Sequence, residues 1–107
     1  MKVIDAVGML YDRSVDFERK MPFDPIAINS DDGEFRHFRA IISPVNTMTR
    51  EEFSNRFVSS AAIISLYLRN NEQTITGGID KYVLPEMRED AKKLLNNMKK
   101  ILNVILE

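Results

Sequence analysis

The sequence contains no cysteine and no tryptophan, and its one histidine is His37. The lack of cysteine excludes disulfides, thiol nucleophiles and cysteine-ligated zinc. A single histidine also excludes any metal site that needs several of them. Asp31, Asp32 and Glu34 form a short acidic cluster, but the remainder of the calcium-loop pattern, with its closing glutamate, is missing. We therefore predict no metal site and no cofactor.

The chain also has few glycines and prolines, and its net charge is close to zero. Only 4 glycines and 4 prolines occur among 107 residues, and 15 basic side chains against 16 acidic ones leave a formal charge of −1. This composition excludes a disordered or collagen-like chain. The charge gives no bulk attraction to nucleic acid or to acidic membranes. The length predicts a single domain over residues 1–107.

Long apolar runs are missing as well. The longest extends from Val58 to Leu68, is broken by three serines, and has about half of the roughly 20 residues that a membrane span needs. Asp5 interrupts the apolar stretch near the N-terminus, and no small-residue cleavage pattern follows it, which argues against a signal peptide. We expect a cytoplasmic protein with no membrane partner.

In the first half of the chain, apolar residues tend to alternate with polar ones. Val15 and Phe17 alternate with polar and charged neighbours as on a half-buried strand, whereas residues 2–11 fit either a strand or a short helix. The turn residues Ser30–Gly33 precede the apolar run Phe35–Ile42, and an Asp-Gly pair between apolar runs is typical of a tight hairpin. These patterns predict a small antiparallel sheet of three or four strands.

In the second half of the chain, apolar residues recur at the three- and four-residue spacing of a helix. Thr49–Glu52 fits a capping box, and a helical apolar stripe follows over about residues 50–69. Thr76–Gly78 is expected to be a mobile or tightly turning connection. Pro85 suits a first helical position, and the acids and lysines of residues 85–106 complement the helix dipole. We predict an α+β fold in which the sheet packs with two helices, at about 50–69 and 85–106.

A wide apolar stripe follows the last predicted helix at heptad spacing. It can pack within one chain, or pair in part with a second subunit, and the two arrangements are compatible. The helix before it is apolar nearly all round in residues 61–68, so the chain has more apolar surface than one sheet face can cover. We therefore expect protein contacts, including homodimerisation, through this earlier helix or through the stripe Met87, Ala91, Leu94, Leu95, Met98, Ile101, Leu102 and Ile105.

Aromatic and basic side chains interleave over residues 35–39. On a strand, three of them would share a face that could stack bases and hold phosphates, and residues 91–106 add four lysines with no acid. The acids just before this segment oppose phosphate binding, and an ordinary solvated face explains the same residues. Single-stranded nucleic acid is therefore the alternative partner, with candidate contacts Phe35, Arg36, His37, Arg39, Lys92, Lys93, Lys99 and Lys100.

No catalytic arrangement accompanies these patterns. His37 has no serine or cysteine nucleophile tied to it by a motif, and the adjacent Glu51 and Glu52 diverge on a helix. Gly77 and Gly78 lack a phosphate-loop pattern. We expect a non-enzymatic binding protein acting through protein–protein contacts, as an adaptor, assembly factor or inhibitor of the kind that phages and other mobile elements encode at this size.

Overall fold

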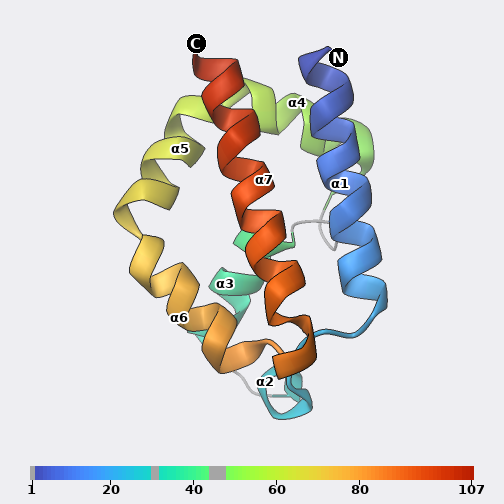
Figure 1. Cartoon of the computed structure of the whole chain (residues 1–107), viewed down its shortest axis with the longest axis vertical. Coiled ribbons are helices and arrows are strands. Elements are labelled where there is room, and N and C mark those ends of the chain that lie inside the picture. Colours follow the sequence, from blue (N-terminus) through green and yellow to red (C-terminus); the bar gives the residue numbers. More distant parts are fainter. Residues whose placement is uncertain (1, 30–31, 44–47) are drawn as a thin grey trace.

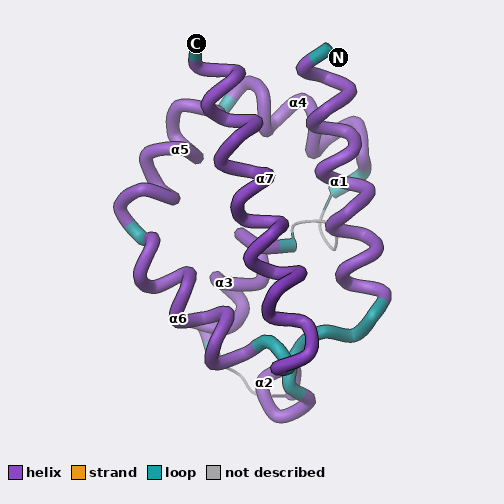
Figure 2. The backbone as a smooth tube through the Cα atoms, in the orientation of Figure 1, coloured by secondary structure: helices purple, strands orange, loops and turns teal. Residues whose placement is uncertain are grey.

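The protein is built almost entirely from helices (Figures 1 and 2). The computed structural model describes residues 2–29, 32–43 and 48–107, and within those ranges its β structure is limited to an isolated antiparallel bridge between Phe23 and Val83. The predicted α+β fold with a small antiparallel sheet is therefore wrong. The elements are, in chain order, α1 (Val3–Arg19), α2 (Pro25–Asn29), α3 (Gly33–Ile42), α4 (Arg50–Ser59), α5 (Ala61–Asn70), α6 (Glu72–Tyr82), the 3₁₀ turn η2 (Pro85–Met87) and α7 (Arg88–Leu106).

The last helix, α7, runs through the middle of the molecule, with α1 on one side and α5 and α6 on the other (Figure 1). The predicted helix over residues 85–106 is confirmed, with Pro85 opening η2 directly ahead of α7. The apolar stripe of α7 faces the core, because its central members are at most 5% exposed: Ala91, Leu94, Leu95, Met98 and Leu102. This stripe is therefore covered within one chain.

The first helix replaces both elements expected near the N-terminus. Residues 2–11 are helical apart from their start, and the predicted strand at Val15 and Phe17 is wrong, because α1 continues through Arg19. The buried positions Val7, Leu10, Ser14 and Phe17 repeat at intervals of three and four residues, which is the helical period. The alternation around Val15 is a short segment of that longer pattern, and such windows do not separate a strand from a helix.

The third helix replaces the predicted hairpin. Residues 30–31 of its turn lie outside the described residues, and the predicted strand Phe35–Ile42 is wrong, because this run is helical. Asp32 caps α3: its carboxylate accepts a hydrogen bond from the backbone N–H of Glu34 at 2.9 Å, which is the main reason that the pKa of Asp32 is lowered. The buried residues of α3 are spaced by three and four: Phe35, Phe38 and Ile42.

The predicted helix over residues 50–69 is divided into α4 and α5 at Ser60. Its capping box is confirmed at Thr49, whose hydroxyl accepts a hydrogen bond from the backbone N–H of Glu52 at 3.2 Å. The carboxylate of Glu52 accepts from the hydroxyl of Thr49, at 3.0 Å, and not from a backbone N–H as predicted. The division lets α4 pack on α1 while α5 packs on α7.

The predicted turn at Thr76–Gly78 is also wrong, because these residues lie inside α6. Gly78 is where α6 meets α3: a Cβ atom added there would lie 2.5 Å from a ring carbon of Phe38, whereas Gly77 faces open space. The same two helices are joined by the hydroxyl of Tyr82, which donates to the carboxylate of Asp32 at 3.1 Å. Burial raises the pKa of Tyr82, so this hydroxyl stays protonated as a donor.

The antiparallel bridge between Phe23 and Val83 joins two connecting segments near the start of α7. The backbone N–H of Asp24 donates to the carbonyl of Tyr82 at 2.8 Å, and that of Leu84 donates to the carbonyl of Pro22 at 2.7 Å. Between these bonds Phe23 enters the core, where it is 2% exposed. The bridge therefore fixes the connection between α1 and α2 against the connection between α6 and α7.

Met21 follows the end of α1 in the left-handed region, with a φ of 52°. Its side chain is 73% exposed, so it has little packing to lose. We expect Met21→Gly to raise the free energy of unfolding by about 0.5–1 kcal/mol, because glycine adopts this conformation without the Cβ clash. Urea denaturation measures the change. Met21→Ala is the matched control: it keeps the Cβ and should show no gain, and an equal gain in both variants would contradict a backbone origin.

Candidate functional site: an apolar groove beside α5

The residues predicted to form a protein interface lie mostly inside the chain. Of the α7 stripe, five members belong to the core, and Met87, Ile101 and Ile105 are half-buried. The stripe packs against α1, α5 and α6. A partner could reach the five core members only if those helices moved away from α7, so the stripe as a whole is not an open docking surface.

The residues predicted to contact nucleic acid are not brought onto one face. Phe35 is buried, and Arg39 holds both carboxylate oxygens of Glu18, at 2.9 and 3.1 Å. Lys99 binds Glu72 at 2.9 Å. The other candidates are exposed, on α3 and on α7: Arg36, His37, Lys92, Lys93 and Lys100. The flat aromatic and basic face that a strand would give does not form, because α3 turns successive side chains by about 100°.

An apolar opening lies between α3 and the pair α4 and α5, and we call it the groove. Its volume is about 320 Å³. It opens to solvent beside α5, because Ile63, which lines it, is 73% exposed. The lining is apolar apart from His37, Arg56 and the hydroxyl of Tyr67, and its described members are His37, Ala40, Ile41, Met48, Phe53, Arg56, Phe57, Ile63, Ile64, Tyr67, Leu68 and Met98.

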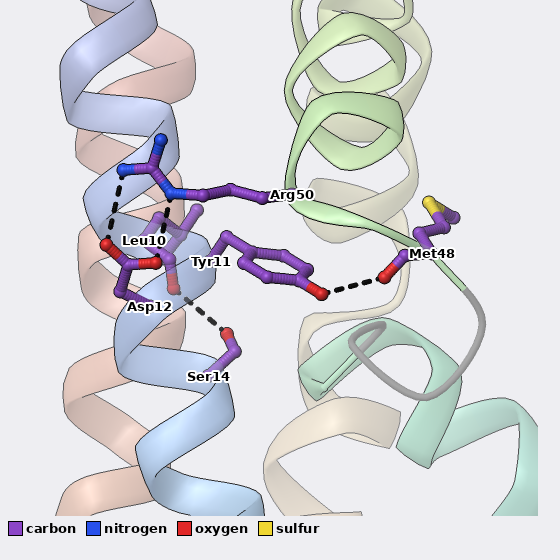
Figure 3. A network of polar contacts seen from close by, with 6 residues as sticks. All are labelled: Leu10, Tyr11, Asp12, Ser14, Met48 and Arg50. Atoms are coloured by element: carbon purple, nitrogen blue, oxygen red, sulfur yellow. Dashed lines mark hydrogen bonds and ion pairs between the residues drawn. The ribbon is translucent and has the colours of Figure 1, made fainter.

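The α4 wall of the groove is held in place from α1 (Figure 3). The guanidinium of Arg50 donates to both carboxylate oxygens of Asp12, at 3.0 and 3.2 Å, and the hydroxyl of Tyr11 donates to the carbonyl of Met48 at 2.8 Å. The ring of Tyr11 also packs on Phe53, with ring centroids 5.6 Å apart. These contacts fix the first turn of α4, so Met48 and Phe53 line a preformed groove.

A second cavity of about 270 Å³ lies next to the groove and extends along α3 toward α6. The two share His37, Ile41 and Tyr67 as lining residues. The Nε2 atom of His37 is hydrogen-bonded to the hydroxyl of Tyr67, and the two rings meet edge to face. This pair therefore forms the wall between the two cavities. The second cavity is less apolar, since Glu34 and Lys81, an ion pair at 3.8 Å, contribute to it.

The groove has positive charge and no negative charge in its described lining. Arg56 is exposed, and its guanidinium makes no hydrogen bond or ion pair with residues 2–29, 32–43 or 48–107. The nearest acid on the same helix face is Glu52, one turn earlier, whose carboxylate accepts a hydrogen bond from the hydroxyl of Thr49 at 3.0 Å. The groove is therefore an apolar surface with a cationic edge.

Beside the groove, the outer face of α5 is apolar and open to solvent. Ile63 is 73% exposed and Leu66 is 55% exposed, with exposed Ala62 on the same side of the helix. The sequence indicated a docking surface on this helix, because residues 61–68 are apolar nearly all round. In the structure α5 packs on α7 and leaves Ile63 and Leu66 exposed. Nothing in the sequence indicated Arg56 or Tyr67, whose place depends on how α3 packs.

Comparison with known proteins adds no relative. No protein-family model matches the chain, and neither the curated proteins nor the solved structures yield a significant match. Across the described ranges, no helix combines the length and the apolar character that crossing a membrane requires. In the same ranges, the potential metal-ligating side chains do not gather into a group of three or more.

Proposed function

We propose that this chain is a non-enzymatic binding protein that acts through protein contacts, and that its groove receives an apolar side chain of the partner. The observation that carries the proposal is an open apolar cavity of about 320 Å³ that continues, at Ile63, onto the exposed face of α5. Protein interfaces concentrate their binding energy in side chains anchored in such desolvated pockets, surrounded by contacts that exclude water. An adaptor, assembly factor or inhibitor in the cytoplasm is the role that we propose.

The size of the groove fits one or two bulky side chains. Its volume of about 320 Å³ is at the lower end of the range for small-molecule sites. Each Leu, Ile or Phe side chain that it buries contributes roughly 1.5–3 kcal/mol. Two such anchors would supply a large part of the roughly 8 kcal/mol of a micromolar complex. The α5 face would add contact area around them.

The polar groups of the groove favour binding over catalysis. A nucleophile in an acyl- or group-transfer site needs a base within hydrogen-bond reach, and the base needs a third group to orient it. His37 is hydrogen-bonded to the hydroxyl of Tyr67 at the wall of the groove, but no third group among the described residues holds its other ring nitrogen. The groove therefore supplies apolar contact together with a few directional donors.

The test is a selection from a random peptide library displayed on phage, with the immobilised protein as the target. The matched variant is Ala40→Trp, which fills the groove from an exposed position on α3. The control is Ile26→Trp on α2, at the far end of the molecule from α4 (Figure 1). We expect peptides with a bulky apolar residue that bind the wild type and Ile26→Trp alike, and bind Ala40→Trp about tenfold more weakly. Peptides that bind all three proteins equally, or no enrichment, would contradict the proposal.

The homodimer expected from the sequence is checked by sedimentation over a wide concentration range. The variant is Leu66→Glu, which places a charge on the exposed face of α5 without reaching the core. A dimer that this variant dissociates would assign the α5 face to a second copy of the chain. A monomer at all concentrations would contradict the homodimer expected from the sequence and leave the face open for another protein.

A further inference from the structure

The arginines of this chain differ in what they bind. Arg39 and Arg50 hold carboxylates, and Arg88 donates to the backbone carbonyls of Asp80 and Val83. Arg56, at the groove, has no such partner among the described residues. Its charge is solvated as long as the groove is open. Arg56 lines the groove, so a partner that covers the groove lies against this residue.

Covering an arginine without pairing it is unfavourable. A charge that loses water and gains no hydrogen bond costs several kcal/mol, whereas a carboxylate can restore the interaction. The described lining of the groove contains no carboxylate, and that of Glu52, one turn before Arg56, lies against Thr49, whose hydroxyl donates to it at 3.0 Å. A carboxylate of the partner can therefore supply the interaction that the lining does not.

We propose that the partner of the groove is an acidic peptide segment, in which a bulky apolar residue enters the cavity and a nearby aspartate or glutamate accepts hydrogen bonds from Arg56. The planar guanidinium matches a carboxylate through two parallel hydrogen bonds, which adds specificity as well as affinity. This inference rests on the proposed function, because it specifies the partner of the same site.

The exposed face of α5 favours a peptide over a small amphipathic anion. A molecule that filled only the cavity of about 320 Å³ would leave the outer side of Ile63 and Leu66 in water. A segment of polypeptide can fill the cavity and continue over this face. Burial of both parts requires several consecutive residues, and the acid then lies beside the anchor in the same segment.

The experiment uses the peptides that bind the wild type more tightly than Ala40→Trp. Their sequences should be enriched in aspartate or glutamate within a few positions of the apolar anchor. Isothermal titration of one such peptide then compares the wild type with Arg56→Lys and Arg56→Glu. We expect Arg56→Glu to weaken binding by about tenfold or more, and Arg56→Lys to weaken it less, since lysine keeps the charge but loses the paired geometry.

Two controls isolate the role of Arg56. Arg19→Glu makes the same change of charge on an exposed residue of α1, on the opposite side of α7 from α5, and should leave the affinity close to that of the wild type. A peptide whose acid is replaced by lysine should bind Arg56→Glu better than it binds the wild type. All variants are at exposed positions, and their circular dichroism and thermal midpoints establish that they are folded.

The outcomes separate this inference from the proposed function. Groove-dependent peptides that lack acids, or that bind Arg56→Glu as tightly as the wild type, would overturn the acidic partner and leave the binding function standing. A selection without groove-dependent peptides would overturn both. A dimer of the wild type that Arg56→Glu dissociates would also overturn the inference, because the groove would then belong to a second copy of this chain.

Discussion

Phe23→Ala is expected to lower the free energy of unfolding by about 3–5 kcal/mol. The side chain is 2% exposed, and its ring meets those of Phe17, Phe35 and Phe38 at centroid distances of 5.9, 5.5 and 6.4 Å. The guanidinium of Arg39 lies 5.1 Å from the same ring centroid. Removing the ring leaves a cavity where α1, α3 and the bridge segment meet. Small domains have a free energy of unfolding of only about 5–15 kcal/mol, so this substitution would remove a large part of it.

Urea denaturation followed by circular dichroism at 222 nm measures the loss. Phe23→Leu is the matched control: it keeps an apolar side chain in the space, and we expect a loss of about 1–2 kcal/mol. A loss for Phe23→Ala below about 1 kcal/mol would contradict the central position of this ring in the core.

The second large effect is a difference in sign between neighbouring glycines of α6. Gly77→Ala should stabilise the protein by up to about 1 kcal/mol, because alanine is the better helix former and the position faces open space. Gly78→Ala should destabilise it by about 1–3 kcal/mol, because the added methyl group would lie 2.5 Å from the ring of Phe38. The two variants make the same chemical change on the same helix, so each is the control for the other.

Thermal denaturation should separate the two variants clearly, since about 1 kcal/mol shifts the midpoint of a domain of this size by roughly 4–8 °C. Combining Gly78→Ala with Phe38→Leu should recover part of the loss, because the smaller side chain makes room for the methyl group. Stabilisation by both single alanine variants would show that α3 and α6 are further apart than the structure has them.

The long periodic segments of the chain could be predicted from the sequence. The stripe of α7 repeats over five turns, and no strand reproduces spacings of three and four residues over that length. The N-cap at Thr49 could also be predicted, because its hydrogen bond with the backbone N–H of Glu52 is local and joins residues only three positions apart. These features need no knowledge of the remainder of the fold.

The wrong predictions concern residues that are equally common in a turn and in a helix. Asp32 and Gly33 suit a hairpin turn, yet aspartate is equally favourable as the N-cap of a helix, and here it caps α3. Gly77 and Gly78 suit a turn, yet a glycine also lets two helices approach closely. Choosing between these roles requires knowing that Phe38 lies opposite Gly78, and only the tertiary structure supplies that contact.

The groove could be predicted only in part. The surplus of apolar residues over 61–68 indicated an uncovered helix, and α5 does expose Ile63 and Leu66. The opposite wall comes from α3, which the sequence pattern assigned to a strand. Arg56 becomes notable only when the positions of the surrounding acids are known, because its sequence neighbours are ordinary for an exposed helix.

The central position of α7 bears on how the chain folds as it is synthesised. Ribosomes add residues from the N-terminus at about 5–20 per second, so α1, α5 and α6 are complete before the helix against which they pack. Until α7 emerges, the apolar faces of these helices have no permanent cover. We expect the nascent chain to recruit chaperones at this stage, and the native packing to form only once α7 has been released into solution.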